Sequence, residues 1–136
     1  KLFSKFDNEF PMVDVPALLV RKLGGISIIP HPNRTRFWYP FGVSTDFVKE
    51  HLAGLVDAIE DISVGHGYDE NYSEELGLAS IGSSDDHFNL IIGTTVTGYD
   101  STQYNDLLSA VKNRGTRAIK VEHSLSEILT TMRQII

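Results

Sequence analysis

Short apolar runs typical of buried strands alternate along this chain with segments of helical periodicity, and this alternation constrains the fold most strongly. Strands are expected at 26–29, 55–64, 78–81 and 118–121. Helices are expected at 13–23, behind an N-cap at Ser44, at 72–76, at 103–113 and behind an N-cap at Ser124. Parallel strands joined by helical crossovers produce this order, whereas a hairpin sheet does not. The sequence therefore predicts an α/β fold built from parallel βα units.

The whole chain, residues 1–136, is predicted to be a single domain, with an irregular lead-in at 1–12. A hydrophobic content of 41% and a charged content of 22% are typical of a folded globular chain, and no internal repeat or flexible linker divides it. The predicted strands are too few to close a barrel, since an eight-stranded α/β barrel takes about 250 residues. We therefore expect half of a barrel.

Composition narrows the function classes. The chain has no cysteine, so histidine and carboxylate are its only strong metal ligands. A formal net charge of -6 disfavours binding to long nucleic acid, although nucleic acid stays possible as a partner. No apolar run approaches the roughly 20 residues that cross a bilayer, and no signal peptide pattern opens the chain. We expect a cytoplasmic protein without a membrane partner.

Three metal-binding side chains follow predicted strands. His31 comes directly after the strand at 26–29, and Asp85 and His87 follow the strand at 78–81. Function in parallel α/β folds gathers at the carboxyl ends of strands, where these loops meet. An i, i+2 spacing in extended backbone also points Asp85 and His87 to one side. The pattern predicts a metal site, and the alternative is that Ser83 or Asp85 only caps the next segment.

Two further side chains have less specific patterns. His66 lies between two glycines after the strand at 55–64, where it could approach the site, although such glycines more often mark a turn. Glu60, inside that strand, is expected to face the core or an ion partner.

Several strings, in order, resemble one family. The segment GGISIIPHP at 24–32 is similar to the glycine-glycine, apolar strand, His-Pro segment of the PHP superfamily, the polymerase and histidinol phosphatase domain. The strings AIE at 58–60, ELGL at 75–78 and SDDH at 84–87 resemble that family's Ile-Glu strand, Lys-Leu-Gly-Leu turn and Ser-Asp-Ala-His metal motif. The strings LLSA at 107–110 and GTRA at 115–118 resemble its leucine-rich helix and Arg-Thr-Arg-Ala ending.

This resemblance implies a distorted, seven-stranded TIM-like barrel with divalent metals at its carboxyl rim. It implies hydrolysis of phosphoesters, with His31, Asp85 and His87 as metal ligands and zinc, manganese or iron as the cofactor. The string at 31–34 resembles a His-Pro-x-Arg motif of some relatives, so Arg34 is a candidate for binding substrate phosphate; the alternative is a solvated loop arginine. The implied substrate is a small phosphorylated molecule, and no catalytic residue is assigned.

The chain also departs from the family's pattern. No His-x-His pair precedes His31, and the chain begins with Lys1. We therefore expect the C-terminal portion of a longer PHP protein, which is inactive alone and whose partner is the missing N-terminal half of the barrel or a second copy. The alternative function is an inactive PHP-like structural module that self-associates through its exposed seam.

Overall fold

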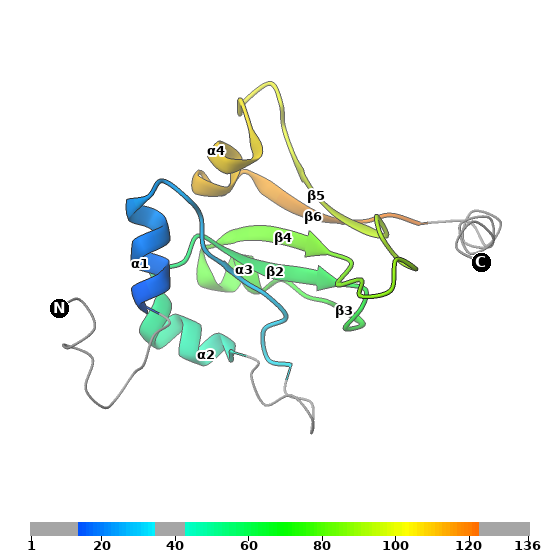
Figure 1. Ribbon diagram of the computed structural model, residues 1–136, viewed down its shortest axis with the longest axis horizontal. Helices are drawn as coiled ribbons and strands as arrows, with labels where there is room; N and C mark the ends of the chain where they lie inside the picture. Colours follow the sequence, from blue (N-terminus) through cyan, green and yellow to red (C-terminus); the bar gives the residue numbers. More distant parts are fainter. Residues whose placement is uncertain (1–13, 35–42, 123–136) are drawn as a thin grey trace.

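Three parallel strands form the centre of the protein. The computed structural model describes residues 14–34 and 43–122 (Figure 1). β2 (Ala58–Ser63) pairs in parallel with β1 (Ile28–Ile29) on one edge and with β4 (Ala79–Ser83) on the other. β2 is buried along almost its whole length, as is usual for a strand covered on both faces. The α/β class and the parallel pairing of these strands are confirmed.

The expectation of parallel strands alone is wrong for two pairs. β3 (Tyr68–Asp69) returns antiparallel along the end of β2, because the turn at 64–67 is too short for the crossover of a dozen or more residues that a parallel return needs. β5 (Thr95–Tyr99) and β6 (Thr116–Lys120) form a separate antiparallel ribbon. Within the described ranges, neither sheet closes into a barrel.

The helices lie close to their predicted positions. They are α1 (Asp14–Lys22), α2 (Thr45–Phe47), which continues into the π-helical segment η1 (Val48–Leu52), α3 (Tyr72–Leu76) and α4 (Leu107–Lys112). Ser44 is the N-cap of α2, as predicted, since its Oγ accepts a hydrogen bond from the Phe47 N–H at 3.1 Å. α4 is shorter than the predicted 103–113, because it begins only behind a capping box formed by Asp106 and Ser109.

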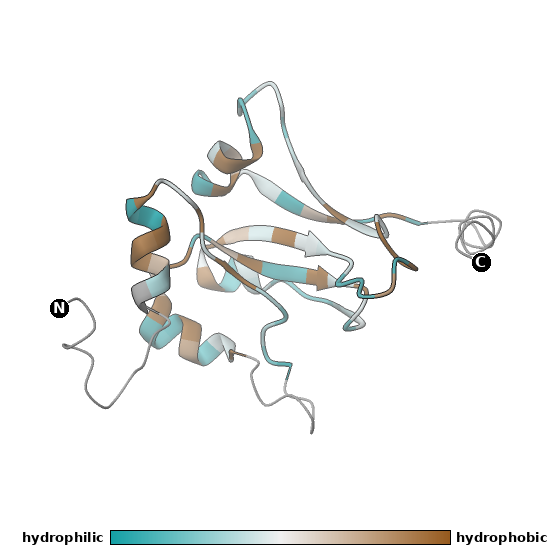
Figure 2. Cartoon of the chain, in the orientation of Figure 1, coloured by the Kyte–Doolittle hydropathy of each residue, from teal (hydrophilic) through white to brown (hydrophobic). Residues whose placement is uncertain are grey.

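Apolar side chains pack on both faces of the central sheet. Ile59 of β2 faces a cluster with Leu52 and Val48 of η1, whereas its neighbour Ala58 faces Val111 of α4. Adjacent residues of a strand point to opposite faces, so β2 takes part in both clusters. Figure 2 shows the apolar stretches on the strands, α1 and α4 that supply these contacts.

A close approach at Gly82 joins the ribbon to the central sheet. The Thr97 hydroxyl accepts a hydrogen bond from the Gly82 N–H and donates one to the Gly82 carbonyl, both at 3.1 Å. A Cβ on Gly82 would lie only 2.7 Å from the Val96 carbonyl oxygen, so only glycine fits here. On the same side, the Ala118 N–H donates to Ser80 Oγ at 3.0 Å, which sets β6 beside β4 (Figure 1).

Some predicted segments lie outside the described residues, namely the lead-in at 1–12 and the last helix behind Ser124. In the part of the chain that is described, no helix combines the length and apolar character needed to span a membrane.

Candidate metal centre at the strand ends

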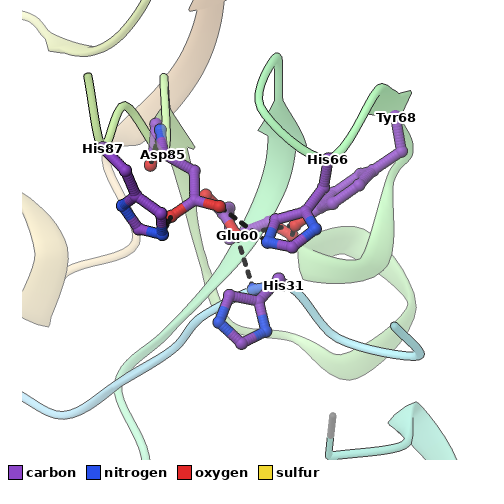
Figure 3. Close-up of polar contacts among 7 residues, drawn as sticks. His31, Glu60, His66, Tyr68, Asp85 and His87 are labelled. Carbon is purple, nitrogen blue, oxygen red and sulfur yellow. Dashed lines mark hydrogen bonds and ion pairs between the residues drawn. The ribbon is translucent and has the colours of Figure 1, made fainter. Parts of the chain in front are cut away.

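The loops that leave β1, β2 and β4 meet at one end of the central sheet. His31 follows β1, His66 lies in the turn after β2, and Asp85 and His87 follow β4. Because these strands are parallel, their carboxyl ends lie at the same edge, and Figure 3 shows the four side chains around a common region. The structure therefore brings the predicted ligands His31, Asp85 and His87 to one rim.

The Asp85 carboxylate lies between two imidazoles (Figure 3). Its Oδ2 is 2.7 Å from Nε2 of His66, and its Oδ1 is 3.9 Å from Nε2 of His87. The His66 ring in turn contacts the His31 ring, with 4.8 Å between the ring centroids. His87 is the most accessible member, with 75% of its side chain exposed, whereas Asp85 is 24% exposed. The cluster is thus partly sheltered but open on the side of His87.

Two residues of the cluster hold a left-handed backbone conformation. The φ angles are 32° at His31 and 46° at Asp85, a region that costs a residue with a side chain about 1 to 2 kcal/mol. Hydrogen bonds support both conformations. The His31 N–H donates to Glu60 Oε2 at 2.5 Å, and the Asp85 N–H donates to Ser83 Oγ at 3.0 Å. Strain that is held in this way is typical of functional loops.

A buried polar layer lies behind His31. Glu60 of β2 is only 3% exposed, and its Oε2 also accepts a hydrogen bond from the Tyr68 hydroxyl at 2.7 Å. Burial, followed by this hydrogen bond to Glu60, raises the pKa of Tyr68 well above its usual range. The Glu60 prediction, a core or ion-partner position, agrees with the burial of this side chain. Its contact with the His31 backbone was not predicted.

Arg34 lies next to this layer. Its guanidinium carbon is 4.5 Å from the centre of the Tyr68 ring, a cation–π contact. Its Nε is buried and has no hydrogen-bond partner among the described residues. Arg34 therefore reaches the site region through Tyr68 and Glu60 and keeps unused hydrogen-bonding capacity there.

The alternative that Ser83 or Asp85 caps the next segment holds for Ser83, whose Oγ accepts a hydrogen bond from the Asp85 N–H, and Asp86 caps the residues beyond it. Asp86 accepts hydrogen bonds from the N–H groups of Phe88 at 2.9 Å and Ile91 at 2.8 Å. Desolvation raises the pKa of Asp86, but the hydrogen bonds from these backbone N–H groups outweigh it, so this pKa lies below its ordinary value. Ser83 holds the Asp85 backbone, as described above. The Asp85 carboxylate is thus left for the two imidazoles.

The donor set fits a divalent ion in its chemistry. Two ligand atoms bound tetrahedrally at about 2.0 to 2.1 Å from zinc lie about 3.3 Å apart. The separations of 2.7 Å and 3.9 Å from Asp85 to its two histidines lie on either side of that value. Within residues 14–34 and 43–122, no group of three or more His, Asp or Glu side chains already has the spacing of a formed metal site. The side chains would therefore have to reorient to surround an ion.

His66 is the residue that the sequence pattern did not select. Its glycine neighbours indicate a turn, which the structure confirms, but the turn also carries the imidazole to Asp85. The sequence feature that points to His66 as a candidate site residue is its position after a central parallel strand. The same feature points to His31.

Comparison of the chain with protein-family models, with curated proteins and with solved structures found no match. The fold and the site together define an α/β domain with a histidine–aspartate cluster at the carboxyl ends of its parallel strands.

Proposed function

We propose that this chain is the C-terminal region of a PHP-type, metal-dependent phosphoesterase. The observation that carries the proposal is the position of His31 and of the Asp85–His87 loop at the same end of the central sheet, where His66 contacts both His31 and Asp85, although the two loops are far apart in the sequence. These residues were selected by motif and strand position.

In this proposal His31, Asp85 and His87 hold a zinc, manganese or iron ion. Such an ion, when bound, activates water and stabilises charge on phosphoryl oxygens. Glu60 fixes the His31 backbone, and Asp86 holds the loop that carries His87. Arg34 offers a guanidinium group to a substrate phosphate, because it lies over the Tyr68 ring beside Glu60 and His31. A small phosphomonoester fits the acidic chain better than long nucleic acid does.

The proposal includes a distorted, seven-stranded barrel of which this chain forms one part. The second edge of β1 is not paired with any strand of the described residues. Further βα units could add at this edge and supply the remaining ligands. In the complete protein they would come from an upstream segment or from a second copy.

The alternative is an inactive module that self-associates. The observation that favours it is the exposure of Leu18, Leu19 and Leu23 on and just after α1, which are 50%, 51% and 78% exposed. Leucines exposed together on one helix are typical of an interface. Such a module would not need the histidine–aspartate cluster.

Metal content distinguishes the two functions. We would dialyse the purified chain against each of zinc, manganese and iron, remove unbound metal, and measure bound metal by elemental analysis. The same measurement on an Asp85→Ala, His87→Ala double variant is the comparison. Metal that is retained by the wild type and lost by the variant supports the phosphoesterase.

Activity is then tested with a longer version of the protein that includes the proposed upstream units. We expect metal-dependent release of phosphate from small phosphomonoesters, abolished by Asp85→Ala. Light scattering on the wild-type chain tests the alternative. Stable oligomers without bound metal, and phosphate release that Asp85→Ala does not alter, would refute the phosphoesterase proposal.

A further inference from the structure

His66 makes the shortest side-chain contact in the cluster. Its Nε2 lies 2.7 Å from Asp85 Oδ2, whereas His87 stands 3.9 Å from the other oxygen of the same carboxylate. Its ring also contacts the His31 ring. The His66 side chain thus touches both loops of the proposed metal site (Figure 3).

The loop that carries His66 is built to lie against the loop after β4. The Gly65 N–H donates to the Ser84 carbonyl at 2.9 Å. A Cβ on Gly65 would lie 2.7 Å from the Asp85 carbonyl oxygen and 2.8 Å from the Ser84 carbonyl oxygen, so only glycine permits this approach. The glycine that indicates an ordinary turn therefore has a second role, which is to place His66 beside Asp85.

We propose that His66 is a further ligand of the divalent ion, shared with Asp85 and His31. This inference rests on the proposed function and extends its ligand set. An imidazole nitrogen and a carboxylate oxygen that already lie 2.7 Å apart need only a small separation to bind one ion together. The side chain of His66 is 20% exposed, so it is sheltered from solvent and still accessible to an ion.

A structural hydrogen bond between His66 and Asp85 is the competing explanation. Such a bond would stabilise the turn, and metal binding would not depend on it. The two explanations therefore differ in whether residue 66 enters the coordination shell, which cobalt(II) reports directly through its visible spectrum.

The first experiment is a cobalt(II) titration of the wild-type chain and of His66→Ala, followed by visible absorption. Asp85→Ala gives the reference for loss of a ligand. His51→Ala is the matched control, because His51 lies on η1, where its ring contacts Phe47. We expect the dissociation constant for cobalt(II) to rise at least tenfold in His66→Ala and to stay within twofold of wild type in His51→Ala.

The second experiment replaces the ligand atom. The chain contains no cysteine, so His66→Cys introduces the only thiol. If residue 66 binds the ion, the cobalt(II) complex of His66→Cys acquires a thiolate-to-cobalt charge-transfer band in the near ultraviolet. His51→Cys should show no such band. This result supports the inference even if His66→Ala does not fold.

The outcomes separate the inference from the proposed function. If the wild type binds cobalt(II) and Asp85→Ala abolishes binding, but His66→Ala binds as wild type does and His66→Cys shows no band, the inference about His66 is wrong and the metal site stands. If the wild type itself binds no cobalt(II), zinc or manganese, the proposed function fails and the inference fails with it.

Discussion

Glu60 offers the sharpest test of how the fold positions the site. A single oxygen, Oε2, accepts both the His31 N–H at 2.5 Å and the Tyr68 hydroxyl at 2.7 Å. Glu60→Ala removes the acceptor of both bonds. Glu60→Gln can place its amide oxygen where Oε2 lies and so keep both bonds. The pair of variants therefore separates loss of the acceptor from loss of the charge.

The size of the effect follows from the burial of the two donors. A buried donor left without a partner costs about 1 to 3 kcal/mol. The Tyr68 side chain is buried, whereas His31 is only half-buried, so water can replace part of its bond. Removal of the buried carboxylate also removes the cost of burying its charge, which offsets a further part of the lost stability. We expect Glu60→Ala to lower the free energy of unfolding by about 2 to 4 kcal/mol, and Glu60→Gln by about 1 to 2 kcal/mol.

Urea denaturation followed by circular dichroism measures both values. Asp61→Ala is the matched control, because Asp61 is the neighbouring buried carboxylate on β2. It accepts hydrogen bonds from the N–H and hydroxyl of Ser73, at 2.8 Å and 2.5 Å, and these bonds do not involve His31. Asp61→Ala should destabilise the fold without shifting the ring-proton resonances of His31. Glu60→Ala should destabilise the fold, shift the ring-proton resonances of His31 and weaken cobalt(II) binding.

Two results would refute this reasoning. One is a Glu60→Ala protein within about 0.5 kcal/mol of wild type, which is the range of an ordinary surface substitution. The other is a Glu60→Gln protein as destabilised as Glu60→Ala, since the bond geometry would then have no part in the effect.

Three further predictions concern the loops and pH. Gly65→Ala should cost about 1 to 3 kcal/mol in a thermal melt and weaken cobalt(II) binding, since its methyl group would meet the Asp85 carbonyl oxygen at 2.7 Å; unchanged melting would contradict this. Burial and Glu60 raise the pKa of Tyr68 above its ordinary 10.0, so Tyr68 should not ionise in the native protein near pH 10, and wild type and Tyr68→Phe should give the same native tyrosine absorbance titration. In the unfolded chain the Tyr68 hydroxyl does ionise near pH 10. The free energy of unfolding should therefore fall as pH rises above 10. Hydrogen bonds from Ser109 lower the pKa of Asp106 below its ordinary 3.8. The stability that this cap contributes is therefore present above pH 3.8 and is lost as the pH falls through the lowered pKa. Asp106→Ala should flatten the acid unfolding curve in that pH range.

The parallel core could be predicted from the sequence because its signals are local. Ile28–Ile29 is wholly apolar, and Ala58–Ser63 carries Ala58, Ile59 and Ile62 around two buried carboxylates; each run lies between helical patterns. Short runs rich in branched apolar residues are typical of strands in sheets covered on both faces. Helix positions follow from caps and periodicity, which also act within a few residues.

The β5–β6 ribbon could not be predicted, because its pairing depends on distant contacts. Thr95–Tyr99 follows a glycine-interrupted apolar stretch and has no clear strand boundaries. Its place is set by the two hydrogen bonds between Thr97 and Gly82 and by the absence of a side chain on Gly82. No local pattern contains that information.

Strand position selects the candidate site residues. His31, Asp85 and His87 follow strands, and His66 follows a strand as well, although its glycines indicate a turn. Turn formation and site formation are compatible when the turn lies at the carboxyl end of a parallel strand, so the turn composition alone does not exclude His66.

The strained and buried polar groups near these strand ends give an independent reason to place function there. His31 and Asp85 have positive φ angles, and Glu60 is a charged group with 3% exposure. Each of these features costs free energy. Glu60 lies on β2, and His31 and Asp85 follow the strands on either side of it; Glu60 accepts a hydrogen bond from the His31 N–H, and His66 contacts both His31 and Asp85. If metal binding is what this arrangement serves, variants that relieve the strain, such as His31→Gly, should stabilise the metal-free protein or leave it unchanged while abolishing cobalt(II) binding.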